Sequence, residues 1–157
     1  MKTLVAYYSQ SGQTKKYAEI IAKKFNADKF KIEPVRPYNE DMWDAWDEAQ
    51  IERKNNSIRD IKTSLPNISE YDLIILGTGV WGYTMSNPMF KFIESLDFSN
   101  KITSGFWTFY DHDEKINKDM KNKLKNSNYR TGLPIPRSLR NEEEAINKWI
   151  ETLKEEI

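Results

Sequence analysis

The segment Ser9–Thr14 joins a short apolar run, Leu4–Tyr8, to a stretch with helical patterning near the start of the chain. The first backbone N–H groups of a helix have no partner inside the helix, and the helix dipole favours negative charge at that end. The segment supplies three hydroxyl donors, and Gly12 lets the backbone turn tightly with no Cβ in the way. It therefore predicts a phosphate-binding loop.

Two familiar phosphate motifs are absent from this segment. It contains no Lys or Arg, so it is not a Walker A loop, and the GxGxxG spacing of a dinucleotide fold is missing. A Ser/Thr turn that only caps a helix is the alternative interpretation. The position after a first buried strand favours a ligand loop, because doubly wound sheets bind mononucleotides beyond the carboxyl ends of their strands.

Strand and helix patterns alternate along the whole chain, which predicts a parallel sheet with helices on both faces. Continuous apolar runs at Leu4–Tyr8 and Leu73–Leu76 are typical of central strands. Alternation around Phe30 and Ile32 favours an edge strand. Further strands are expected at Phe106–Phe109 and, as a Pro-containing second edge, at Arg130–Ile135. Four helices are expected from these apolar stripes: Ala18, Ile21, Ala22 and Phe25; Met89, Phe92, Ile93 and Leu96; a weaker Ile116, Met120 and Leu124; and Ile146, Trp149, Ile150 and Leu153.

The two edge-like strands are the second and the fifth of the five, which fits the strand order 2-1-3-4-5. In that order the ligand lies at the switch between strands one and three, so the segment after strand three should also face it. That segment, Gly77–Thr84, is expected to be a loop whose glycines expose backbone groups to a flat polar ring. Trp81 or Tyr83 could stack on the ring. Ordinary packing of a half-buried Trp81 is the alternative.

At these residues the chain resembles the flavodoxin family, over almost its whole length. Ser9, Ser11, Gly12 and Thr14 match the family's phosphate loop, Thr/Ser-x-Thr/Ser-Gly-x-Thr. The resemblance implies a three-layer α/β/α sandwich and FMN as a non-covalent cofactor, with Trp81 over its isoalloxazine ring. We expect these residues to bind the cofactor: Ser9, Gln10, Ser11, Gly12, Gln13, Thr14, Thr78, Gly79, Val80, Trp81, Gly82, Tyr83 and Tyr110.

The loop after strand four matches the family poorly. Tyr110 is the best candidate there for a second flavin contact, and a Tyr that merely ends a core strand is an equal alternative. His112, the only histidine, is expected to be a solvated loop residue, and a proton relay near the flavin edge is the alternative. Asp111 and Asp113 flank it, but Asp near a helix start is ordinary capping, so we expect no metal site. No residue stands out as a general acid or base.

The segment Tyr38–Leu65 is expected to be an insertion between strands two and three. Met42, Ala45, Trp46 and Ala49 have helical spacing, so core packing is the default, and a surface patch with Trp43 and Trp46 is the alternative. The sequence predicts a solvated basic face made of Arg53, Lys54, Arg59 and Lys62.

Composition limits the class of protein. The 157 residues, expected to form a single domain (1–157), include no cysteine, which excludes disulfides and thiolate metal sites and is compatible with a cytoplasmic location. Twenty-four basic residues balance twenty-four acidic ones, which argues against nucleic acid as a partner. Neither a signal peptide nor a span of membrane length is visible.

By resemblance, the expected function is electron transfer to redox partner proteins or to a small-molecule acceptor, by a monomer or a dimer. An FMN-dependent quinone reductase and a protoporphyrinogen-oxidising enzyme are the alternatives among enzymes. A flavin-free binding module of the same fold, which meets partners through Trp43 and Trp46, is the alternative from another class.

Overall fold

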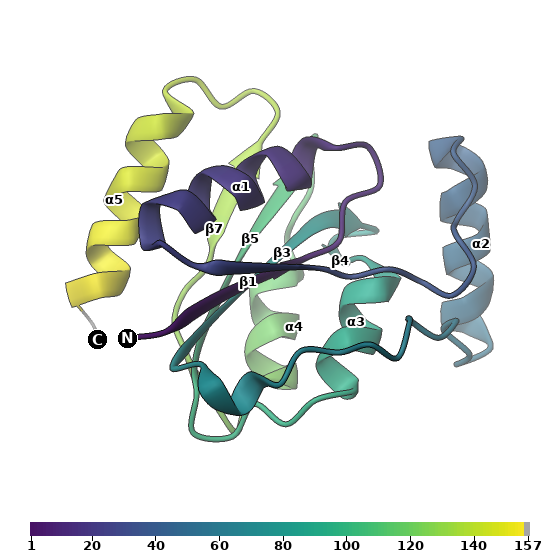
Figure 1. Cartoon of the computed structure of the whole chain (residues 1–157). Helices are drawn as coiled ribbons and strands as arrows, with labels where there is room; N and C mark the ends of the chain where they lie inside the picture. Colours follow the sequence, from purple (N-terminus) through teal and green to yellow (C-terminus); the bar gives the residue numbers. More distant parts are fainter. Residues whose placement is uncertain (156–157) are drawn as a thin grey trace.

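The computed structural model describes residues 1–155, which form a parallel sheet with helices on both faces (Figure 1). The elements in chain order are β1 (Thr3–Tyr7), α1 (Gln13–Phe25), β2 (Asp28–Lys31), α2 (Met42–Lys54), a 3₁₀ turn (Ile68–Glu70), β3 (Leu73–Trp81), β4 (Thr84–Met85), α3 (Asn87–Glu94), β5 (Ile102–Phe109), α4 (Ile116–Lys123), β6 (Asn128–Tyr129), β7 (Leu133–Pro136) and α5 (Glu142–Glu155). The main strand order is β2-β1-β3-β5, followed by β6 and β7 on the far side of β5. This is the predicted flavodoxin-like order.

Successive residues of β1 and β3 point to opposite faces of the sheet, so these central strands feed two cores. Leu4, Ala6, Ile74 and Leu76 pack on the side of α3 and α4. Val5, Tyr7, Leu73 and Ile75 pack on the side of α1 and α5. Both faces of these strands are buried, which explains their continuous apolar runs.

The four predicted helices exist and bury their stripes. Ile146, Trp149, Ile150 and Leu153 of α5 are at most 9% exposed, and Ile116, Met120 and Leu124 at α4 are at most 2% exposed. Phe25 and Leu96 are only partly buried, and Leu96 lies beyond the end of α3.

The prediction of a loop at Gly77–Thr84 is wrong for six of its eight residues, because Gly77–Trp81 belong to β3 and Thr84 begins β4. β3 continues to Trp81 because Gly77, Thr78 and Gly79 pair with Phe106, Trp107 and Thr108 of β5. Gly77 serves packing here, since a Cβ on it would lie 2.2 Å from Cζ of Phe106. β3 then turns back through a two-residue turn into β4.

The predicted second edge strand is displaced and divided. β6 and β7 flank residues 130–132, and β7 ends at Pro136 rather than at Ile135. At the interruption the Ser104 hydroxyl donates to the Arg130 carbonyl over 2.9 Å, so a side chain satisfies a group that a continuous ladder would pair with backbone.

The helix α2 covers neither face of the sheet. Figure 1 shows it beyond the carboxyl ends of the strands, on the same side as the loop between β1 and α1. A small cluster of Tyr38, Ala45 and Ala49 packs with Trp46 and Trp81. The insertion between β2 and β3 is thereby brought to the edge where doubly wound folds bind their ligands.

Candidate functional site

The amino end of α1 is open. Gly12 is its N-cap residue, with φ of 97°, so no N-cap side chain bonds to the first turn, and that turn carries no acidic residue. By contrast, Asp41 caps α2 by accepting from the backbone N–H groups of Trp43 at 2.8 Å and Asp44 at 3.0 Å. The first turn of α1 therefore keeps the N–H groups and the dipole that an anion needs.

The loop before α1 is held in shape by its own bonds. The Gly12 N–H donates to the Ser9 hydroxyl over 3.0 Å. Gln10 accepts a hydrogen bond from the Tyr8 hydroxyl and donates to the Asn39 carbonyl over 2.8 Å. Burial raises the pKa of Tyr8 to about 12, so its hydroxyl stays protonated and able to donate. A Cβ on Gly12 would have no atom within 4 Å, so the space above the turn is open.

The loop meets the sheet at Gly79. The hydroxyl oxygens of Thr14 and Thr108 lie 2.9 Å apart. A Cβ on Gly79 would lie 4.0 Å from both of these oxygens and 3.9 Å from Nε1 of Trp81. Three polar atoms from β3, β5 and α1 thus surround a glycine, a cradle that a side chain would fill. The open helix end suits an anion and the cradle suits a polar ligand chain, so the residues present fit a phosphate-bearing ligand such as FMN.

The β3–β4 hairpin turns at Gly82 and Tyr83, whose φ values are 62° and 72°. Positive φ at both central residues is typical of a type I′ turn, in which glycine is favoured. Trp81, just before the turn, is half-buried and makes edge-on contacts with Tyr8 and Tyr38, with ring centroids 5.8 and 5.0 Å apart. The structure thus brings Trp81 against Tyr8, which directly precedes the Ser9–Thr14 loop, and Tyr83 remains 47% exposed.

Other residues expected at the site differ in their surroundings. Thr78 is fully buried, and its hydroxyl is bonded to the Ser86 hydroxyl at 2.9 Å and the Ser86 N–H at 3.1 Å, so its side chain faces the protein interior. Val80 packs against the core on the α3 side. Ser11 and Gln13 are exposed in the loop before α1 and at its start.

Tyr110 follows β5 and is 56% exposed, with the Arg137 guanidinium 4.7 Å from its ring centre. It therefore does not end the strand as a core residue. His112 is exposed as expected, and its hydrogen bond to Glu114 raises its pKa. The ring centres of His112 and Tyr83 lie 5.4 Å apart, so the loop after β5 contacts the β3–β4 hairpin.

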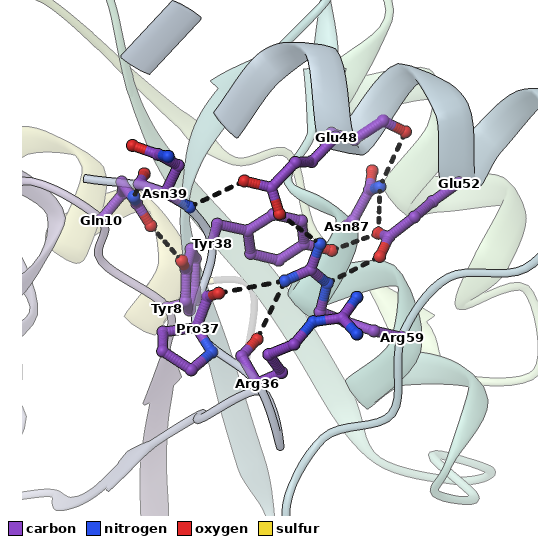
Figure 2. Close-up of polar contacts among 11 residues, drawn as sticks. Tyr8, Gln10, Arg36, Pro37, Tyr38, Asn39, Glu48, Glu52, Arg59 and Asn87 are labelled. Carbon is purple, nitrogen blue, oxygen red and sulfur yellow. Dashed lines mark hydrogen bonds and ion pairs between the residues drawn. The ribbon is translucent and has the colours of Figure 1, made fainter. Parts of the chain in front are cut away.

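The prediction of a solvated basic face is wrong for Arg53 and Arg59. Arg59 is only 7% exposed and forms ion pairs with Glu48 at 2.7 Å and Glu52 at 2.6 Å (Figure 2). Arg53 donates to the backbone carbonyls of β3 and β4 (below). Charge clusters usually face water, and nothing local in the sequence signals that these two guanidiniums find partners across the insertion. Lys62 does lie exposed, paired with Glu33.

Glu52 lies at the centre of this network. Burial opposes its ionisation, but hydrogen bonds from Tyr38, Arg59 and Asn87 outweigh the burial and lower its pKa. Burial and the bond to Glu52 raise the pKa of Tyr38. The guanidinium of Arg59 also lies 3.6 Å from the centre of the Tyr38 ring. The network therefore fixes Tyr38, which contacts Trp81.

The two tryptophans of α2 have different surroundings. Trp46 is half-buried against the hairpin, since a Cβ on Gly82 would lie 2.3 Å from its ring. Trp43 is 78% exposed. The prediction that Met42 packs in the core is wrong, because Met42 is 58% exposed in the first turn of α2.

Across residues 1–155, no cluster of three or more His, Asp or Glu side chains is arranged to hold a metal ion. No helix in this range has the length and apolar character needed to cross a membrane.

Comparisons with known proteins agree with this geometry. The structure superimposes with a TM-score of 0.84 on a candidate flavoprotein from Bacteroides eggerthii, at 25% identity over 98% of each chain. A flavoprotein from Lactobacillus acidophilus, solved in complex with FMN, gives 0.79 at 21% identity over 95% of this chain and 98% of that one. Oxidised flavodoxin 2 from Bacillus cereus gives 0.65 at 17% identity over 100% of each chain. A search of curated protein sequences finds no significant match. A sequence model of the flavodoxin family matches residues 2–153, and the chain belongs to that family.

Proposed function

We propose that this protein binds FMN without a covalent bond and acts in electron transfer. The observation that carries the proposal is the open amino end of α1 next to the Gly79 cradle. Two independent parts of the chain, the loop before α1 and the end of β3, leave space and polar groups at one edge of the sheet. That edge is where doubly wound sheets bind mononucleotides.

In this proposal the backbone N–H groups at the start of α1 and the hydroxyls of Ser9 and Ser11 bind the phosphate. Thr14 and Thr108 line the path from the phosphate to Trp81, which lies beside the ring system. FMN supplies the redox chemistry when bound, and the chain binds it, orients it and excludes water from one face.

Titration of the apoprotein with FMN and with riboflavin tests the phosphate site. We expect FMN to bind much more tightly, since charge-assisted hydrogen bonds to a phosphate contribute roughly 1.5–3 kcal/mol each. Equal affinities for the two ligands would exclude the phosphate loop, and a protein that binds neither would support the flavin-free binding module.

Gly12→Val places a branched side chain in the open space above the turn and should abolish the preference for FMN over riboflavin. The substitution also strains the backbone, because φ of Gly12 is 97°. Asn26→Val is the matched control, since Asn26 caps the other end of α1 with φ of 50°. If Asn26→Val lowers FMN affinity as much as Gly12→Val, strain rather than phosphate exclusion explains the loss.

The electron-transfer role has its own test. Chemically reduced holoprotein should pass single electrons to a haem acceptor protein, measured by stopped-flow absorbance. Sustained turnover of NADH with a quinone would favour the quinone reductase instead. Oxidation of protoporphyrinogen by the holoprotein would favour the protoporphyrinogen-oxidising enzyme.

A further inference from the structure

We propose that Arg53 of α2 is a positioning residue that fixes the β3–β4 hairpin and so sets the place of Trp81 at the site. This inference extends the proposed function, but its first test needs no flavin.

The hairpin extends beyond the sheet. The last pair between β3 and β5 joins Gly79 to Thr108. Beyond it, Val80 and Trp81 pair only with the two residues of β4. A two-stranded ribbon of this length is marginal by itself, so its position depends on contacts from outside the sheet.

Arg53 supplies such contacts to both strands of the hairpin. Its Nη1 donates to the Trp81 carbonyl over 2.8 Å, and its Nη2 donates to the Met85 carbonyl over 2.9 Å. Its Nε donates to Oδ1 of Asn87 over 2.6 Å. These three acceptors are uncharged oxygens, so Arg53 acts through the fixed directions of its N–H groups and forms no ion pair with them. Bonds to both carbonyls fix the spacing and direction of the two strands.

A second contact from α2 covers the turn. The Trp46 ring lies against Gly82, and the Arg53 guanidinium lies 5.3 Å from the centre of that ring. One helix therefore holds the hairpin at its turn and at its base.

The helix is itself anchored, so it can act as a fixed support. Asn87 joins Arg53 to Glu52, because its amide donates to Glu52 over 3.1 Å while its carbonyl oxygen accepts from Arg53. Glu52 in turn is held by Arg59, as Figure 2 shows. Arg59 bonds to Glu48, Glu52 and the carbonyls of Arg36 and Pro37, all of them outside the hairpin.

Because Arg53 bonds to the hairpin and Arg59 does not, the two arginines provide a matched pair of variants. Arg53→Lys and Arg59→Lys each keep the charge and remove a partly buried guanidinium fork from the insertion between β2 and β3. A single ammonium cannot span the carbonyls of Trp81 and Met85 together with Asn87. Arg53→Met is the second variant at this position, because it removes all three hydrogen bonds without leaving a buried charge to solvate.

Hydrogen exchange of the apoprotein, measured by mass spectrometry on peptides covering residues 78–86, is the first test. Arg53→Lys and Arg53→Met should speed exchange there by on the order of tenfold, since two hydrogen bonds to the hairpin are lost. Arg59→Lys should speed exchange mainly in residues 36–52 and change these peptides much less, because Glu52 keeps its hydrogen bonds from Tyr38 and Asn87. Unchanged exchange at 78–86 in the Arg53 variants, or equal acceleration by Arg59→Lys, would overturn the proposal. So would failure of both Arg53 variants to fold while Arg59→Lys folds.

Bound FMN gives the second test, through a double-mutant cycle with Trp81. Arg53→Lys should change flavin fluorescence and the reduction potentials in the wild-type background and leave both unchanged in the Trp81→Ala background. Equal effects in the two backgrounds would mean that Arg53 does not act through Trp81. If the wild-type protein binds no FMN, the proposed function fails while the exchange result still decides the role of Arg53 in the hairpin.

Discussion

The hydroxyls of Thr14 in α1 and Thr108 in β5 lie 2.9 Å apart, so a hydrogen bond joins the start of α1 to the sheet. The two residues are 94 positions apart in the sequence. Thr14 is 3% exposed, and both hydroxyls lie beside Gly79 at the candidate site.

Loss of the hydrogen bond between Thr14 and Thr108 should weaken ligand binding. In Thr108→Val, Thr14 loses its hydrogen-bond partner, and we expect FMN affinity to fall by about 0.5–1.5 kcal/mol. Thr103→Val is the control, because Thr103 lies on the same strand and bonds to Ser127 at 2.7 Å, away from the site. Flavin fluorescence titration measures both. Equal losses of FMN affinity in the two variants would show that the bond stabilises the strand and not the site.

Trp81→Ala should brighten bound flavin, weaken its binding by on the order of 1–3 kcal/mol, and make the second reduction step less negative in potential. The physical reason is that an electron-rich indole quenches fluorescence and disfavours added negative charge beside its face. Trp43→Ala is the control, since Trp43 is 78% exposed on α2. If Trp81→Ala keeps wild-type fluorescence, affinity and potentials, Trp81 is a packing residue, and Tyr83 or Tyr110 becomes the stacking candidate.

Gly82→Ala should force the Trp46 ring away from the turn, because the new Cβ would lie 2.3 Å from it. We expect the free energy of unfolding to fall by about 1–3 kcal/mol, as for other overpacked sites, with a red shift in tryptophan emission. Gly12→Ala separates crowding from strain, since Gly12 also has positive φ but open space around it. An equal loss of stability without a red shift in both variants would indicate backbone strain alone.

The Glu52 network should lose its contribution to stability in acid. The pKa of Glu52 in the folded protein lies below its ordinary value of 4.5, so the unfolded chain binds more protons between these two values. The contribution is therefore complete above pH 4.5 and is lost as the pH falls through the folded pKa. We expect Glu52→Gln to cost roughly 1.5–3 kcal/mol at neutral pH and to flatten the acid dependence of urea unfolding.

Glu33→Gln is the control for Glu52→Gln, because Glu33 also has a lowered pKa but forms an exposed pair with Lys62. Its effect should be much smaller, since exposed ion pairs contribute little. An acid dependence that persists unchanged in Glu52→Gln would assign it to other carboxylates.

Local pattern was sufficient for the central strands and for the loop that joins β1 to α1. The apolar run Leu4–Tyr8 and the segment Ser9–Thr14 are adjacent in sequence, so the strand, turn and helix start that they form depend on neighbouring residues only. The family match and the strand order agree with the fold predicted from these local patterns. Helix stripes such as Ile146 to Leu153 were visible for the same reason, because helical spacing is itself a local property.

Long-range contacts override local pattern at the hairpin and at α2. Gly77 and Gly79 suggested a loop by composition, but pairing with β5 makes both of them strand residues. Arg53 and Arg59 belong to a charged run, but each is partly buried because its partners lie elsewhere in the fold. The partners are the carbonyls of Trp81 and Met85 for Arg53, and those of Arg36 and Pro37 for Arg59. The sequence by itself thus determined the apolar centres of the main strands and the strand–loop–helix unit at α1, since those depend on adjacent residues. Folding of the whole chain determined the support behind Trp81, since hydrogen bonds between distant segments form only once the sheet has brought them together.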